Sequence, residues 1–189
     1  KFNISNVNLF ERQVEFDNYY LNGIKIEGVR RYEVVDIEEG VDRTVQMTLE
    51  NGKMIYPDGS FSTKSKIITK YITYNEGERV STSVTGNASG VNSDGTAYEM
   101  EITSPILFTR ACAKELIHKK GKIPVSGVKR ILKGESEIII NYGDGECDFV
   151  AEVTKDGVTE TVDLKEIKRK RRFRNCLLYT SDAADESVG

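Results

Sequence analysis

The segment RTVQMTLENG, residues 43–52, contains the pattern that decides the fold class. Val45, Met47 and Leu49 alternate with polar residues, which predicts a strand with one dry face and one wet face. An Asn-Gly pair follows directly, and this dipeptide favours the positive φ angles of a tight hairpin turn. The segment therefore predicts a strand that ends in a hairpin.

The same combination of alternation and turn pairs recurs along the chain. Asn-Gly or Asp-Gly stands at Asn22-Gly23, Asn51-Gly52, Asp58-Gly59, Asp94-Gly95, Asp144-Gly145 and Asp156-Gly157, with looser turns at Glu39-Gly40, Glu76-Gly77 and Lys133-Gly134. Between these turns we predict strands near residues 11–17, 24–36, 43–50, 60–74, 79–87, 96–103, 125–132, 136–142, 148–154 and 158–164. Three consecutive isoleucines at 138–140 predict a strand that is buried on both sides.

These elements predict an all-β fold, an antiparallel meander of long hairpins. The sheet would form an open roll or, alternatively, a two-sheet sandwich, with at most one short helix near 111–120. We place a long-hairpin region at 1–104 and a C-terminal β region with a cysteine pair at 105–164, continuous with the first. Residues 165–189 are expected to form a basic, disordered tail.

Charge and hydropathy exclude two classes of protein. The chain of 189 residues has no run of about 18 apolar residues, so no transmembrane helix is predicted. Its net charge of −3 combines +6 in residues 165–175 and −3 in 176–189, which leaves −6 for residues 1–164. A mildly acidic body argues against nucleic acid as a partner. We expect the basic run to be a solvated tail, with binding of anionic lipid, polysaccharide or nucleic acid as the alternative.

The two ends of the chain suggest a fragment. The chain begins at Lys1 without a signal peptide, so we expect a mature, trimmed or truncated N-terminus. The final segment CLLYTSDAADESVG, residues 176–189, resembles translated sequencing adapter. We therefore expect the native coding sequence to stop near Asn175 and infer no function from Cys176 onward.

Two sets of residues carry a family resemblance. The first is RQVEFDNYYLNG at 12–23 with Ile26-Glu27-Gly28; the second is PVSG at 124–127, NYGDGECD at 141–148 and Lys155-Asp156-Gly157. They resemble an uncharacterised family of Bacteroidota envelope lipoproteins with an all-β mature part and a C-terminal YGDGxCD motif. The resemblance implies a cell-envelope location, in the periplasm or on the outer-membrane surface. Contact with the membrane would come only through an N-terminal lipid anchor upstream of Lys1.

The expected compartment also bears on how the cysteines pair. Because Cys176 lies in the adapter-like segment, Cys112 and Cys147 remain as an even pair, and in an oxidising envelope we predict that they form a disulfide. Two buried free thiols are the alternative. A redox pair is not expected, since the spacing is not Cys-x-x-Cys.

The acidic loop is the one candidate for metal binding. Asp144, Glu146 and Asp148 bring three carboxylates into five residues, which is dense enough for a calcium site. The preferred interpretation is a tight turn in which Asp144 binds local backbone amides. We predict no cofactor, with calcium as the alternative.

Catalytic motifs are not recognisable in the sequence. The only histidine, His118, lies among lysines and is predicted to be solvated. Tyr19 with Tyr20 and Tyr71 with Tyr74 could stack on sugars, but cross-strand packing is the favoured interpretation. The sequence predicts a non-enzymatic secreted or surface β-protein for adhesion, glycan handling or envelope assembly, with a glycan or an envelope protein as partner. The alternatives are a polysaccharide hydrolase with paired carboxylates and a calcium-stabilised binding module.

Overall fold

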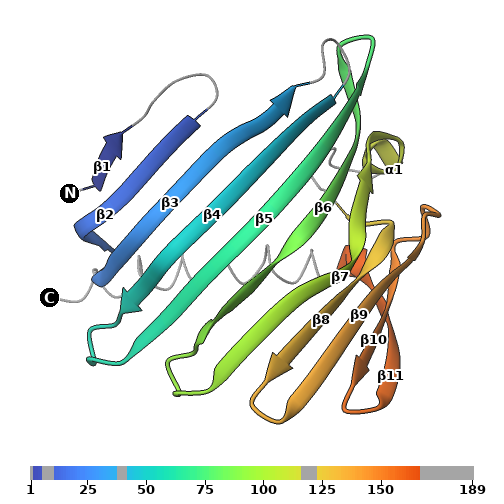
Figure 1. The fold of residues 1–189 in the computed structure, drawn as a ribbon. Helices are drawn as coiled ribbons and strands as arrows, with labels where there is room; N and C mark the ends of the chain where they lie inside the picture. The colour runs from blue at the N-terminus through green and yellow to red at the C-terminus, as the bar shows by residue number, and fades with distance from the viewer. Residues whose placement is uncertain (1, 6–10, 38–41, 116–122, 167–189) are drawn as a thin grey trace, which may run out of the picture.

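One antiparallel sheet makes up the protein (Figure 1). The computed structural model describes residues 2–5, 11–37, 42–115 and 123–166. The strands are β1 (Phe2–Ser5), β2 (Glu11–Leu21), β3 (Ile24–Ile37), β4 (Asp42–Ile55), β5 (Phe61–Asn75), β6 (Glu78–Val91), β7 (Ala97–Thr109), β8 (Ser126–Lys133), β9 (Ser136–Asp144), β10 (Val150–Lys155) and β11 (Val158–Asp163). The helix α1 (Arg110–Glu115) follows β7.

The predicted meander is confirmed. Strand order in the 11-stranded sheet equals chain order, so each strand pairs with its neighbours in sequence, and β1 and β11 are the two edges. The sheet twists and curves from β1 to β11 as one layer, which favours the open roll over the two-sheet sandwich (Figure 1). Each of the ten predicted strands is present, most of them longer than expected, and β1 is the strand that the sequence analysis missed.

The predicted turns mostly connect strands. Asn22-Gly23, Asp58-Gly59, Glu76-Gly77, Asp94-Gly95, Gly134 and Asp156-Gly157 lie between consecutive strands, whereas Glu39-Gly40 lies outside the described residues. In the β4–β5 turn, the Asp58 carboxylate accepts hydrogen bonds from the backbone N–H and the hydroxyl of Ser60, at 2.9 and 2.7 Å. The expected boundary at Ser104-Pro105 falls inside β7, and the sheet continues through it.

The prediction for Asn51-Gly52 is wrong. The pair lies inside β4, where the register with β5 shifts between Leu49 and Gly52, so the two residues form a β-bulge rather than a hairpin. Asn51 has the positive φ of 50° that suggested a turn. A bulge and a hairpin both need such a residue, and only the pairing of β4 beyond the bulge distinguishes them. That pairing continues to Ile55, which lies opposite Phe61.

The sheet has two chemically different faces. Register partners share a face, so Val45, Met47 and Leu49 of β4 lie on the same face as Lys70, Ile68 and Lys66 of β5. We call this side the apolar face and the opposite side the polar face. Val45, Ala88 and Ile106 are buried on the apolar face, while most other side chains of the sheet are only half-buried. The core is therefore thin along the sheet.

A second group of buried residues lies where α1 meets the sheet. Cys112, Ile123, Val125 and Phe149 pack together there, with Leu107, Cys147 and Leu164 against them. The three isoleucines 138–140 are each half-buried, so both faces of β9 are partly covered. The described helix ends at Glu115, and the rest of the helix predicted over 111–120 lies outside the described residues.

We predict that Gly86→Ala is strongly destabilising. Gly86 has φ +136° at a register shift between β6 and β7, and a Cβ there would lie 2.1 Å from the carbonyl oxygen of Ile67. Strained backbone and a forced strand separation should together cost roughly 3 kcal/mol. Gly95→Ala is the matched control: φ is also positive, at +82°, but a Cβ would meet nothing within 4 Å, so only about 1 kcal/mol is expected. Urea unfolding measures both, and equal losses would contradict the steric argument.

Candidate functional site

Four basic side chains gather on the apolar face. We call Arg30 of β3 and Lys64, Lys66 and Lys70 of β5 the basic cluster. Leu49 of β4 pairs with Arg30 on one side and with Lys66 on the other, so these three residues form one row across the sheet. Lys64 and Lys70 lie two and four residues from Lys66 along β5, which places them on the same face.

Like charge surrounds Lys66 in the basic cluster. Burial lowers the pKa of Lys66 most, and the charges of Lys64, Arg30 and Lys70 lower it further. Among the described residues, none of these four side chains forms a salt bridge. Lys66 and Lys70 are half-buried whereas Arg30 and Lys64 are exposed, so the electrostatic cost falls mainly on Lys66, and an anion bound there would relieve it.

Basic residues on the polar face are paired. Arg31 contacts Glu50 at 2.8 Å and donates a hydrogen bond from Nε to Gln13 at 2.7 Å. Lys25 contacts Glu27 at 2.6 Å, which raises the pKa of the lysine and lowers that of the carboxyl. The two faces of the same strands therefore differ in how their cations are compensated.

The registers show that this difference extends over β2–β6. Basic residues paired on the apolar face are Arg12, Arg30, Arg43, Lys64, Lys66, Lys70 and Arg79. Acidic residues with a register partner in these strands are Glu11, Glu15, Glu27, Glu33, Asp36, Asp42, Glu50 and Glu78, and the registers place them on the polar face. The register-paired acids of these strands therefore lie on the polar face, whereas basic residues lie on both faces.

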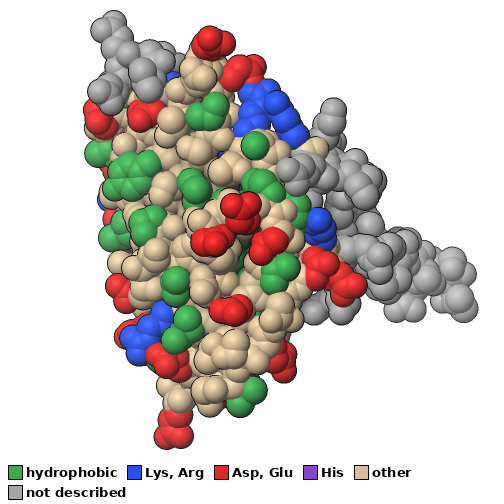
Figure 2. Space-filling view, turned by 90° about the vertical axis from the view of Figure 1, so that its right-hand side faces the viewer, with side chains coloured by type: hydrophobic (Ala, Val, Ile, Leu, Met, Phe, Trp, Pro, Cys, Tyr) green, Lys and Arg blue, Asp and Glu red, His purple; other side chains and the backbone are tan. Residues whose placement is uncertain are grey.

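The other end of the molecule carries the opposite charge. Figure 2 looks at the right-hand side of Figure 1 and shows acidic side chains gathered on that surface. The exposed acids of β9–β11 and their connecting loops include Asp144, Glu146, Asp148, Glu152, Glu160 and Asp163. The basic cluster on β3 and β5 therefore lies in a different part of the sheet from the acidic β9–β11 end.

Apolar side chains surround the basic cluster. Tyr32, Met47 and Ile68 form the next row across β3, β4 and β5, and Val45 lies beside Lys70. Tyr32 remains 37% exposed, which shows that part of this face is accessible. The surface can therefore contact both an anionic group and an apolar group of one ligand.

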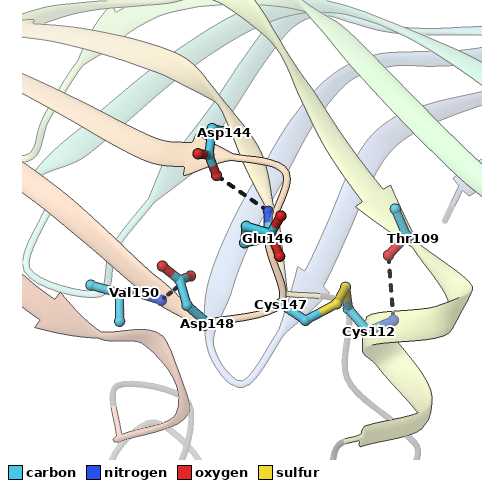
Figure 3. The surroundings of a disulfide bond; sticks show 7 residues. All are labelled: Thr109, Cys112, Asp144, Glu146, Cys147, Asp148 and Val150. Atoms are coloured by element: carbon cyan, nitrogen blue, oxygen red, sulfur yellow. Dashed lines mark hydrogen bonds between the residues drawn. A yellow bond between two sulfur atoms is a disulfide. The ribbon is translucent and has the colours of Figure 1, made fainter.

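The predicted cysteine pair is joined in the structure (Figure 3). Cys112 of α1 and Cys147 of the β9–β10 loop form a disulfide with their Cα atoms 5.4 Å apart, across 35 residues of sequence. The backbone N–H of Cys112 donates to Oγ1 of Thr109 at 3.4 Å, which caps the start of α1. The bond thus attaches α1 to the loop beyond β9.

The acidic loop next to Cys147 forms turns. Asp144 Oδ1 accepts from the N–H of Glu146 at 3.4 Å, and Asp148 Oδ1 accepts from the N–H of Val150 at 3.0 Å (Figure 3). All three carboxylates are exposed. Within the described ranges, no group of three or more His, Cys, Asp or Glu residues is arranged to hold a metal ion. These contacts fit the turn interpretation, and calcium binding stays the alternative.

The remaining sequence candidates do not come together. Tyr71 lies on the polar face and Tyr74 on the apolar face, and the registers separate Tyr19 from Tyr20 in the same way. Neither tyrosine pair therefore forms one stacking surface. His118 lies outside the described residues.

Described residues also line two hollows elsewhere on the protein. One of about 440 Å³ lies between the β5–β6 turn and α1, beside the ion pair of Arg110 with Glu78. The other, of about 230 Å³, lies over β6–β8 and is lined by Glu99, Glu101 and Arg130 among others. Arg130 is already bound to Glu137. Neither hollow offers the combination of uncompensated cations and apolar surface found at the basic cluster.

Comparisons with known proteins identify no family and no relative for this chain. The chain matches no protein-family model, and it has no significant match among curated proteins or solved structures. In the part of the chain that the structure covers, no helix combines the length and hydropathy needed to cross a membrane.

The basic cluster was not predicted, although part of its signal is visible in the sequence. Lys64, Lys66 and Lys70 share one parity with Ile68 and Ile72, so a single strand mixes lysine and isoleucine on one side. Arg30 joins them only through β4, because the register between non-adjacent strands cannot be read from either strand alone.

We predict that loss of the disulfide lowers the free energy of unfolding by roughly 3–4 kcal/mol, because the reduced chain regains the entropy of a 35-residue loop. Urea unfolding of Cys112→Ala/Cys147→Ala against the parent protein measures the loss. A thiol reductant should destabilise the parent protein by a similar amount. The double variant is the control, and its free energy of unfolding should not change when the reductant is added. An equally stable double variant would show that α1 holds its position without the bond.

We also predict that Lys66→Met stabilises the protein at pH 7, by roughly 0.5 kcal/mol, because a half-buried lysine remains screened by solvent. The pKa of Lys66 is lowered in the folded state, so the cost of its charge is fully present below that pKa. The advantage of methionine should shrink as the pH rises toward 10.5, the ordinary lysine pKa. Lys53→Met is the control. The ammonium group of Lys53 lies 4.6 Å from the centre of the Phe61 ring, so its removal should not raise the free energy of unfolding. Denaturant unfolding at pH 7 and pH 10 tests this; a less stable Lys66→Met at pH 7 would contradict it.

Proposed function

We propose that this protein is a non-enzymatic binding protein of the bacterial cell envelope that holds an anionic ligand on its apolar face. One observation carries the proposal: Arg30, Lys64, Lys66 and Lys70 lie together on the apolar face, and none of them forms a salt bridge with a carboxylate of the described residues. A ligand with negative charge would supply the missing partner.

The stability cost supports a binding role. Apolar residues at these positions would make the folded sheet more stable, because Lys66 is half-buried and is surrounded by like charge. Proteins often carry such unfavourable groups where they bind or react. The polar face of the same strands shows the alternative, because Lys25 and Arg31 there are paired with acids.

Two features support the envelope. A disulfide between Cys112 and Cys147 is typical of an oxidising compartment. The segment NYGDGECD at 141–148 carries the resemblance to envelope lipoproteins. Adhesion, glycan handling and envelope assembly all require a binding surface, and periplasm or outer-membrane surface would both suit it.

The test is binding of a polyanion by matched variants. Lys66→Gln/Lys70→Gln removes two charges from the apolar face, whereas Lys25→Gln/Lys53→Gln removes two from the polar face. Affinity for dextran sulfate at low ionic strength should fall roughly 10- to 30-fold in the first variant, at about 1 kcal/mol per charge. The second should stay within about threefold of the parent. Equal losses in both would mean that only net charge matters and would remove the proposed site.

A further inference from the structure

The surroundings of the basic cluster distinguish between kinds of anionic ligand. A polysaccharide would place hydroxyl groups against Met47, Ile68 and Val84, where they would lose hydrogen bonds to water. The sequence also has no tryptophan to stack on sugar rings. A ligand that brings both negative charge and hydrocarbon matches the surface better.

The rows of the apolar face give this ligand an orientation. In the row of Arg30, Leu49 and Lys66, one cation lies on each side of the leucine. The next row, Tyr32, Met47 and Ile68, is apolar and ends at Gly86, which adds no side chain. A phosphate over Lys66 would therefore have an apolar strip directly beside it.

The strip is long enough for an acyl chain. From Lys66 to Tyr74 β5 extends about 26 Å, at roughly 3.3 Å per residue. Ile68, Ile72 and Tyr74, each partly exposed, lie on the apolar face along this length with Val84 beside them on β6, whereas Val45 of β4 is buried and offers no contact area. Lys70 interrupts the strip and gives a second contact for a charged headgroup or for the carboxyl end of a chain.

We propose that the apolar face binds a single membrane lipid with a phosphorylated headgroup, phosphate on the basic cluster and acyl chains along β4–β6. This inference rests on the proposed function, because it names the ligand of the same surface. Charge complementarity selects the occupant: a neutral lipid would leave the cations uncompensated, and a second copy of this face would bring like charge against them.

The experiment uses the full chain and vesicles of defined lipid. The protein is incubated with vesicles of palmitoyl-oleoyl phosphatidylglycerol or palmitoyl-oleoyl phosphatidylcholine, separated from them by size exclusion, and weighed by native mass spectrometry. We expect one phosphatidylglycerol per protein and at least tenfold less phosphatidylcholine. Occupancy should fall at least tenfold in Lys66→Gln/Lys70→Gln and should not fall in Lys25→Gln/Lys53→Gln, with circular dichroism confirming that both variants fold.

Several results would overturn the lipid assignment. Equal uptake of the two lipids, or equal uptake by the two variants, would do so. Protein that adheres to phosphatidylglycerol vesicles but carries no lipid after separation would show attachment to a membrane surface instead. A dimer that lipid does not dissociate would assign the face to a second copy of the chain. The protein could carry no lipid and yet lose affinity for dextran sulfate in Lys66→Gln/Lys70→Gln. In that case the proposed function stands and the assignment of a lipid as the ligand is wrong.

Discussion

Antiparallel pairing between consecutive strands decides which side chains share a face, and the properties of the whole molecule depend on that register. Because successive residues of a strand point to opposite sides, each pairing passes the division into two faces to the next strand. Val45 on β4 thus lies between Val34 of β3 and Lys70 of β5, and Val84 of β6 follows Lys70 in the same row. A shift of one residue between β4 and β5 would move the lysines to the polar face, among acids that would neutralise them.

Bulges keep this division intact while the sheet curves. β4 gains an extra residue between Leu49 and Gly52, and the pairing with β5 resumes with its faces unchanged. The register of β6 with β7 also shifts around Gly86, where a Cβ would lie 2.1 Å from the Ile67 carbonyl oxygen of β5. Curvature is therefore introduced at positions that do not disturb the division into two faces.

The disulfide acts at the other end of the sheet. Cys112 and Cys147 connect α1 to the β9–β10 loop and contribute to the cluster that contains Val125 and Phe149. That cluster is the best-packed part of a protein whose sheet is otherwise thinly covered. The separation of roles is physical: one end is held by a covalent bond and buried side chains, whereas β3–β5 leave an apolar, basic surface accessible.

Local sequence determined the strands and the β4–β5 turn at Asp58-Gly59, since period-two alternation and turn chemistry depend on a few neighbouring residues. The cysteine pair followed instead from the number of cysteines and the expected compartment. The same local signal was misleading at Asn51-Gly52, because a bulge and a hairpin use the same backbone conformation. Only the tertiary structure decided that β1 joins the sheet, that one layer forms rather than two, and that Arg30 meets Lys66 across Leu49. Those features depend on register between strands, and register is a property of pairs of segments that no single segment encodes.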